Sequence, residues 1–106
     1  MSYRFMRTVL FFDLPSVSNS EKRAYRHFVK GLLKRGFIRI QESVFAKLSQ
    51  NQTDVDLTLA SLKSIVPKDG CIMAITVTEK QFSSRKFLLG EIETDVIRSD
   101  EKVIKL

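Results

Sequence analysis

An almost unbroken apolar run near the N-terminus, residues 6–12, ends at Asp13 and is followed two residues later by Pro15. The run is too short to span a lipid bilayer, and its composition predicts a strand in the middle of a sheet. Successive side chains of a strand point to opposite faces of the sheet. Val9 and Phe11 are therefore expected on one face, and Leu10 and Phe12 on the other. A fold built on this strand must therefore cover both faces of its sheet.

Asp13 stands where this strand ends. A rigid strand fixes the position of a carboxylate while its oxygens stay accessible, which makes strand ends a frequent place for chemistry. The alternative is that Asp13 only caps the turn before Pro15. The residues alone favour neither interpretation.

The next segment predicts an amphipathic helix. Ser18 and Glu21 have the spacing of a capping box, and the helix is expected to run to about Arg35 and to end at Gly36. Residues at helical spacing form its expected core face: Ala24, Tyr25, Phe28, Val29, Leu32 and Leu33.

Residues 37–48 predict a strand that breaks near Gln41–Ser43, by a tight hairpin or by a bulge. A second helix is expected to open at Thr53, with an apolar stripe formed by Val55, Leu59, Leu62 and Val66.

The remainder of the chain predicts a turn at 67–70, a strand over 71–77 and a further strand over 85–89 that ends at Gly90. Cys71 lies in an apolar run and is expected to be buried. Residues 91–101 are acidic and irregular, and the tail closes on a short strand-like segment, 102–106.

This order of elements predicts one α+β domain over residues 1–106, a ferredoxin-like βαββαβ sandwich with an added C-terminal strand. Two helices cover only one face of a sheet, so the second apolar face needs another cover. The simplest cover is a second copy of the chain, which predicts a symmetric homodimer. The tail, about 91–106, is expected to dock on the partner protomer.

The formal net charge of +6 is unevenly distributed. Residues 1–53 contain ten lysines and arginines against three acids, whereas residues 54–106 have a net charge of −1. Most of the excess lies on the outer face of the predicted first helix, which favours nucleic acid as a partner over a merely solvated surface. The candidate nucleic-acid-binding residues are Lys22, Arg23, Arg26, Lys30, Lys34 and, on the following strand, Arg39.

Three sequence elements together resemble the CRISPR-associated protein 2 family, the small subunit of the spacer-acquisition machinery. They are the strand that closes on Phe12-Asp13-Leu14-Pro15, the helix end Arg35-Gly36-Phe37, and the element Gln41-Glu42-Ser43-Val44-Phe45. The connector Thr78-Glu79-Lys80-Gln81-Phe82 is similar to the variant found with type II-A systems. The resemblance covers most of the chain through Gly90.

The resemblance implies a symmetric dimer that binds double-stranded DNA and bridges two dimers of the CRISPR integrase. It also implies a second activity, because family members have been described as metal-dependent endonucleases, and the metal-binding, catalytic aspartate of the family maps onto Asp13. Many members have a tyrosine before that aspartate, whereas this chain has Phe12.

Two functions therefore remain open from the sequence. The first is a DNA-binding adaptation subunit, and the alternative is a Mg²⁺-dependent endonuclease, acting on RNA or DNA, in which two copies of Asp13 hold one ion at the dimer dyad. A third, lower-ranked interpretation is a toxin-like ribonuclease or small RNA-binding protein of the same fold. The lone cysteine and the lack of a secretory signal predict a cytoplasmic protein with no membrane partner.

Overall fold

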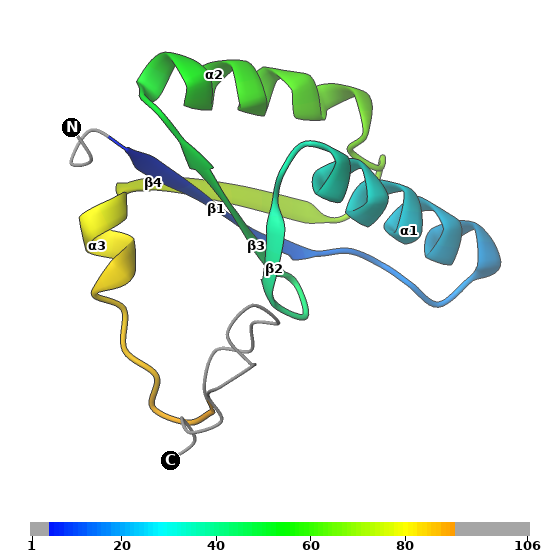
Figure 1. Ribbon diagram of the computed structural model, residues 1–106. Helices are drawn as coiled ribbons and strands as arrows, with labels where there is room; N and C mark the ends of the chain where they lie inside the picture. Colours follow the sequence, from blue (N-terminus) through cyan, green and yellow to red (C-terminus); the bar gives the residue numbers. More distant parts are fainter. Residues whose placement is uncertain (1–4, 91–106) are drawn as a thin grey trace.

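The apolar run near the N-terminus forms strand β1 (Met6–Asp13), an inner strand of an antiparallel sheet in the computed structural model, which describes residues 5–90. The sheet has the order β2-β3-β1-β4 (Figure 1). The other elements are α1 (Asn19–Lys34), β2 (Ile38–Gln41), β3 (Val44–Ser49), α2 (Gln52–Ser61), the 3-10 helix η2 (Leu62–Ser64), β4 (Cys71–Thr78) and α3 (Glu79–Ser83). The βαββαβ order and the strand order confirm the ferredoxin-like fold.

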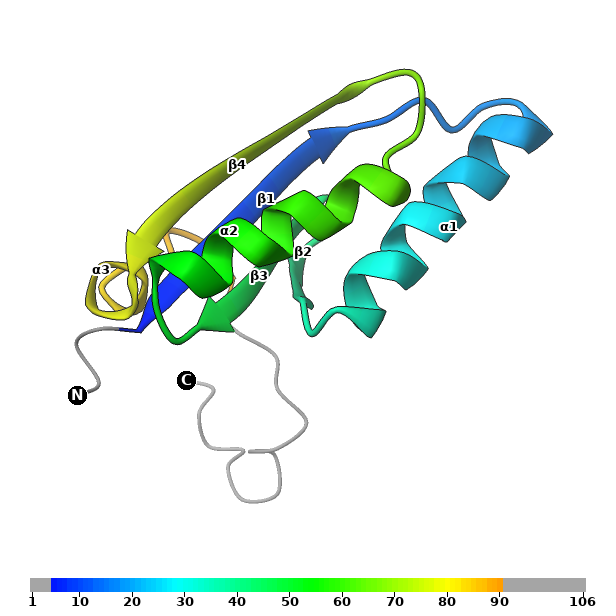
Figure 2. The same cartoon turned by 90° about the horizontal axis from the view of Figure 1, so that it is seen from above.

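The core lies between one face of the sheet and the two long helices, α1 and α2, which lie on the same side of the sheet (Figures 1 and 2). Phe12 is the aromatic centre of this core. Its ring centroid lies 5.1 Å from that of Phe28 on α1 and 5.7 Å from that of Phe45 on β3. Close packing of these aromatic side chains fixes the position of α1 on the sheet.

Helix α1 begins and ends as its local sequence predicts. The Ser18 side chain accepts from the backbone N–H of Glu21, and the Glu21 side chain accepts from the backbone N–H of Ser18, which confirms the capping box. Gly36 has φ +92°, so it terminates the helix in the left-handed region. The predicted core face was wrong at Leu33, which is 54% exposed, while Gly31 is buried against Ile65.

The segment between the two helices forms a hairpin and a bulge together. Gln41 pairs with Val44, so Glu42 and Ser43 are the loop residues, and the register shifts between Arg39 and Gln41. Helix α2 is capped by Asn51 instead of beginning at Thr53. The predicted stripe of α2 was wrong at its end, because the chain turns through η2 and leaves Val66 46% exposed.

The end of the described chain differs most from the prediction. A short helix, α3, follows β4, and its signal was the capping box between Thr78 and Gln81. The strand predicted over 85–89 does not form within the described chain, and Leu88 and Leu89 are 99% and 94% exposed. The predicted tail segments, 91–101 and 102–106, lie outside the described residues.

The face of the sheet opposite α1 and α2 is apolar and open. Strand register places its side chains together, because directly paired residues point to the same face. We call these exposed side chains the open face: Phe11, Ile38, Leu48, Met73 and Ile75. Cys71 lies on the same side, in register with Asp13, which is why the prediction that it is buried was wrong. Among the described helices, none is long and apolar enough to span a membrane.

Candidate functional site

Asp13 is the last residue of β1 and its side chain is exposed. It lies in register with Cys71, the first residue of β4, so it stands at the rim of the open face instead of the helix side. Across residues 5–90 the carboxylate forms no ion pair. Both oxygens therefore remain available for a ligand.

Gly70, just before β4, packs closely on the end of β1. It has φ +110°, and a Cβ atom at this position would lie 2.9 Å from the carbonyl oxygen of Asp13 and 2.6 Å from Cδ2 of Leu14. Only glycine allows the 67–70 turn to approach the strand end this closely. The sequence had predicted a turn at Gly70, but its contact with the candidate site could not be read from local spacing.

The fit of a metal at Asp13 is incomplete within one chain. No group of three or more histidine, cysteine or acidic side chains gathers anywhere in the described part of the chain. An exposed carboxylate is a suitable oxygen ligand for Mg²⁺, which usually binds through one or two carboxylates and several waters. Within one protomer, Asp13 therefore offers a single carboxylate ligand for such an ion.

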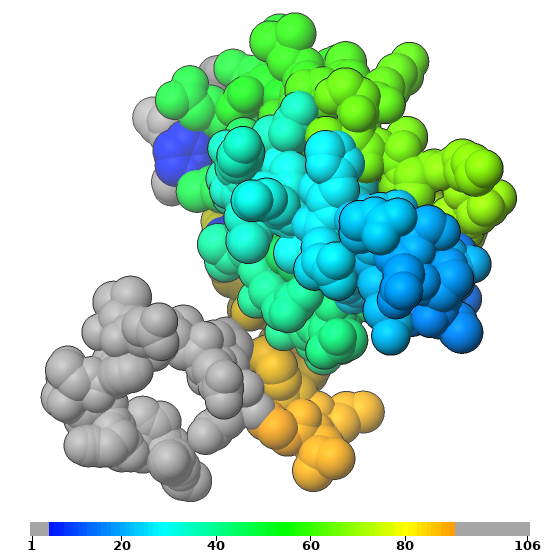
Figure 3. All heavy atoms as spheres, turned by 90° about the vertical axis from the view of Figure 1, so that its right-hand side faces the viewer, coloured from blue at the N-terminus to red at the C-terminus, as the bar shows by residue number. Residues whose placement is uncertain are grey.

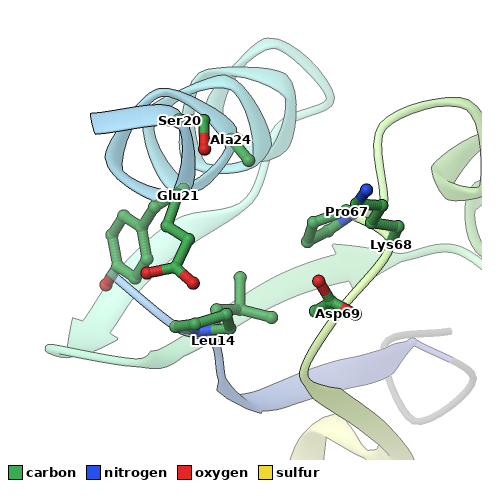
Figure 4. Close-up of a pocket in the computed structure, with 9 residues that line it drawn as sticks. Leu14, Ser20, Glu21, Ala24, Pro67, Lys68 and Asp69 are labelled. Carbon is green, nitrogen blue, oxygen red and sulfur yellow. The ribbon is translucent and has the colours of Figure 1, made fainter. Parts of the chain in front are cut away.

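A cavity of about 380 Å³ lies on the other side of the same strand end, between the start of α1 and the 67–70 turn (Figure 4). Leu14, Tyr25 and Pro67 contribute to its lining. Glu21 also lines it, but the backbone N–H groups of Ser18 and Val17 hold the pKa of its carboxyl below the usual value. Glu21 is thus committed to capping α1, and this cavity does not include Asp13.

The predicted cations of α1 all lie on its outer surface. Each is exposed, and within the part of the chain that the structure describes none forms an ion pair: Lys22, Arg23, Arg26, Lys30 and Lys34. Arg39 lies on the edge strand β2, with its guanidinium carbon 5.1 Å from the ring centroid of Phe45. The structure brings Arg26, Lys30 and Arg39 together around one groove between α1 and β2.

Two other basic residues have structural roles instead. Arg35 donates to the carbonyl of Gly31 at 3.0 Å and to Ser61 Oγ at 3.1 Å, which joins the end of α1 to the end of α2. Lys47 is half-buried and its Nζ lies 3.5 Å from Thr58 Oγ1. Burial therefore distinguishes the exposed cations of α1 and β2 from the two half-buried cations with structural roles. The sequence alone does not show this difference.

A second charged cluster fixes α3 against β1. Arg7 donates through Nε and Nη2 to the two carboxylate oxygens of Glu79, each at 2.8 Å. The same guanidinium lies 4.6 Å from the ring centroid of Phe82, and that of Arg85 lies 4.0 Å from it. The hydrogen bonds from Arg7 hold the pKa of the Glu79 carboxyl below its usual value.

Comparison with known proteins finds one family whose members are similar to this chain. The family described as CRISPR associated protein Cas2 matches residues 6–85. A "CRISPR-associated endoribonuclease Cas2" of Streptococcus mutans serotype c is 44% identical over 101 residues, covering 95% of this chain and 93% of the relative. Another of that name, from Treponema denticola, is 38% identical and is covered completely. A structure titled "Crystal structure of cas2", at 22% identity and a TM-score of 0.57, covers 85% of this chain and 92% of its own, and supports the fold.

Proposed function

Because the chain belongs to the Cas2 family of CRISPR-associated proteins, we propose that it is a metal-dependent endoribonuclease whose site forms between two copies of the chain. The position of Asp13 carries this proposal, since its carboxylate is exposed and unpaired at the end of a rigid central strand. The relatives are named as endoribonucleases, which supports RNA as the substrate class.

The exposed apolar side chains of the open face support a homodimer. Phe11 is 38% exposed, and its neighbours on β4, Met73 and Ile75, are 60% and 52% exposed. A contiguous apolar surface on an inner strand is typical of a protein contact. Burial of this face against a second copy about a two-fold axis would place both Asp13 side chains at the rim of one interface.

The chemistry at this interface needs few groups. Mg²⁺, when bound, supplies charge stabilisation at the phosphodiester and a more acidic water. The two Asp13 carboxylates would hold it, since oxygen ligands suit this ion. No side chain is given the role of general base, because no group of three or more histidine, cysteine or acidic side chains gathers among residues 5–90. We propose that the endoribonuclease acts in the cytoplasm.

Cleavage of a labelled single-stranded RNA with and without Mg²⁺ tests the proposal. Asp13→Asn keeps the size of the side chain but removes its charge, so cleavage should fall at least a hundredfold while sedimentation of the dimer stays unchanged. Asp69→Asn, an exposed acid of the adjacent turn, is the matched control and should cleave normally. Equal cleavage by wild type and Asp13→Asn would exclude the assignment.

The exposed cations of α1 favour a second candidate function. In this role the dimer holds double-stranded DNA and bridges two dimers of the CRISPR integrase during spacer acquisition. Cations on a helix surface contact phosphates without reading sequence, which suits a subunit that accepts any duplex. Spacer insertion by the integrase, measured with wild type and Asp13→Ala, separates the two roles. The nuclease role alone requires the carboxylate.

A further inference from the structure

The groove between α1 and β2 combines an apolar surface with positive charge. It measures about 260 Å³ and is lined by Tyr25, Arg26, Val29, Lys30, Leu33 and Arg39. We call it the α1–β2 groove. Figure 3 shows α1, in blue to cyan, across the middle of one face of the molecule. Leu33 is 54% exposed in the groove although it was predicted to lie in the core.

The lining defines what the groove can accept. Its three apolar side chains gain from contact with apolar groups, and its three cations, none of which forms an ion pair with a described residue, attract anions. A nucleic-acid backbone offers charge but no branched apolar groups. A peptide segment that carries both acidic and branched apolar side chains complements the whole groove.

The chain itself contains such a segment. Residues 91–101 carry five acids and one arginine, a net charge of −4, interleaved with Ile92, Val96 and Ile97. We propose that this segment docks in the α1–β2 groove of its own chain, and not on the partner protomer as the sequence alone predicts, with Val96 and Ile97 against the apolar side chains and the acids beside the cations.

The length of the segment allows the contact. Gly90 is the last described residue, and Glu101 lies eleven positions further on. The anchors Val96 and Ile97 are six and seven positions beyond Gly90, so an extended chain reaches them over about 20–25 Å, more than the 15.3 Å radius of gyration of the molecule. Tethering also raises the local concentration of the segment to about the millimolar range, so that individually weak, solvent-exposed charge pairs are sufficient for docking.

Docking would have a consequence for nucleic-acid binding. Arg26, Lys30 and Arg39 are three of the six candidate nucleic-acid-binding residues, so a docked segment competes with a duplex for them. This consequence, but not the docking itself, rests on the proposed DNA-binding role.

Zero-length carbodiimide coupling of the full-length protein tests the docking directly. The reagent joins a lysine amine to a carboxylate in contact with it, and mass spectrometry maps the pairs. In the band of monomer mass, Lys30 should couple to acids of 91–101 at least fivefold more than Lys63, an exposed lysine in η2. Equal coupling of the two lysines, or coupling found only in the dimer-mass band, would overturn the proposal.

Two full-length variants separate the apolar and the charged contributions. Lys30→Arg keeps the charge but removes the amine, so the cross-link should disappear. Val96→Ser with Ile97→Ser keeps every charge, and coupling at Lys30 should fall severalfold if these side chains anchor the segment. Unchanged coupling in the double variant would refute the anchoring. Duplex affinity tests whether the docked segment competes with DNA. A triple variant that removes three acidic charges should bind a duplex about threefold more tightly or better: Asp95→Asn, Asp100→Asn and Glu101→Gln. Unchanged affinity would exclude the competition.

Discussion

Arg7 and Glu79 are 72 positions apart in the sequence and form a two-point ion pair, in which Nε and Nη2 of the arginine each lie 2.8 Å from a carboxylate oxygen. The arginine is 14% and the glutamate 29% exposed, so water screens the pair only in part. The contact attaches the first turn of α3 to β1, and it thereby sets the direction in which the chain continues beyond β4.

Glu79→Gln should lower the free energy of unfolding at pH 7 by about 1–2 kcal/mol, because it removes charge-assisted hydrogen bonds. The pKa of Glu79 is lowered in the folded state from its ordinary 4.5. A lowered pKa stabilises the fold above the ordinary value, and this contribution is lost as the pH falls through the folded pKa. Urea denaturation at pH 7 and pH 3 should therefore show a larger difference between wild type and variant at pH 7 than at pH 3. Lys80→Gln, on the exposed side of α3, controls for helix propensity.

If the proposed dimer forms through the open face, Met73→Glu should convert it to a monomer. The substitution places like charges in an interface formed by the open face of both copies, where burial of an unpaired carboxylate is unfavourable. Sedimentation velocity at micromolar concentration measures the change. Leu57→Glu, on the exposed surface of α2 at 67% exposure, should leave the dimer intact. A wild-type protein that sediments as a stable monomer would contradict the dimer altogether.

Replacement of four α1 cations, Lys22, Arg26, Lys30 and Lys34, by alanine should flatten the salt dependence of duplex binding. Each phosphate contact contributes about 0.9 to the slope of log affinity against log salt concentration, so the slope should fall by up to about 3–4 for each helix engaged. A matched variant removes the same charge elsewhere, at Lys63, Lys68, Lys80 and Lys86, all exposed. Equal slopes for the two variants would show that total charge, and not α1, governs binding.

Gly70→Ala should destabilise the protein by about 1–3 kcal/mol, since it adds both an unfavourable φ and a contact with the Asp13 backbone. Gly90→Ala is the matched control: its φ of +84° is also positive, but no atom lies within 4 Å of the added Cβ. Thermal melting should give a larger loss for Gly70→Ala. The excess over Gly90→Ala measures the packing of the turn on the strand end, and an excess of zero would contradict that packing.

Several features of the site were predictable because they depend on close neighbours in the sequence. The placement of Asp13 at a strand end follows from the apolar run before it, and the exposure of Lys22 and Lys34 follows from helical spacing. The capping box of Ser18 and Glu21 is likewise a relation across three positions. Thr78 and Gln81 form a capping box as well, but the sequence did not predict α3, because this helix has only five residues.

Other features were not predictable because they depend on packing. Leu33 has the helical spacing of a core residue. The rotation of α1 about its axis nevertheless buries Gly31 and leaves Leu33 in the lining of a groove. Cys71 lies in an apolar run, but its strand partner is Asp13 at the rim of the open face. Periodicity gives the face of an element on which a side chain lies, but not what covers that face.

The sequence by itself determined the order of the elements from β1 to β4, the ends of α1 and the excess of positive charge on that helix, since propensity, capping and spacing act over a few residues. Only the tertiary structure decided that Gly70 packs on the end of β1, that Arg39 joins Arg26 and Lys30, and that Leu33 lines a groove instead of the core. These relations arise because the antiparallel sheet brings distant segments side by side, and the strand order that does so is set by the packing of the whole core.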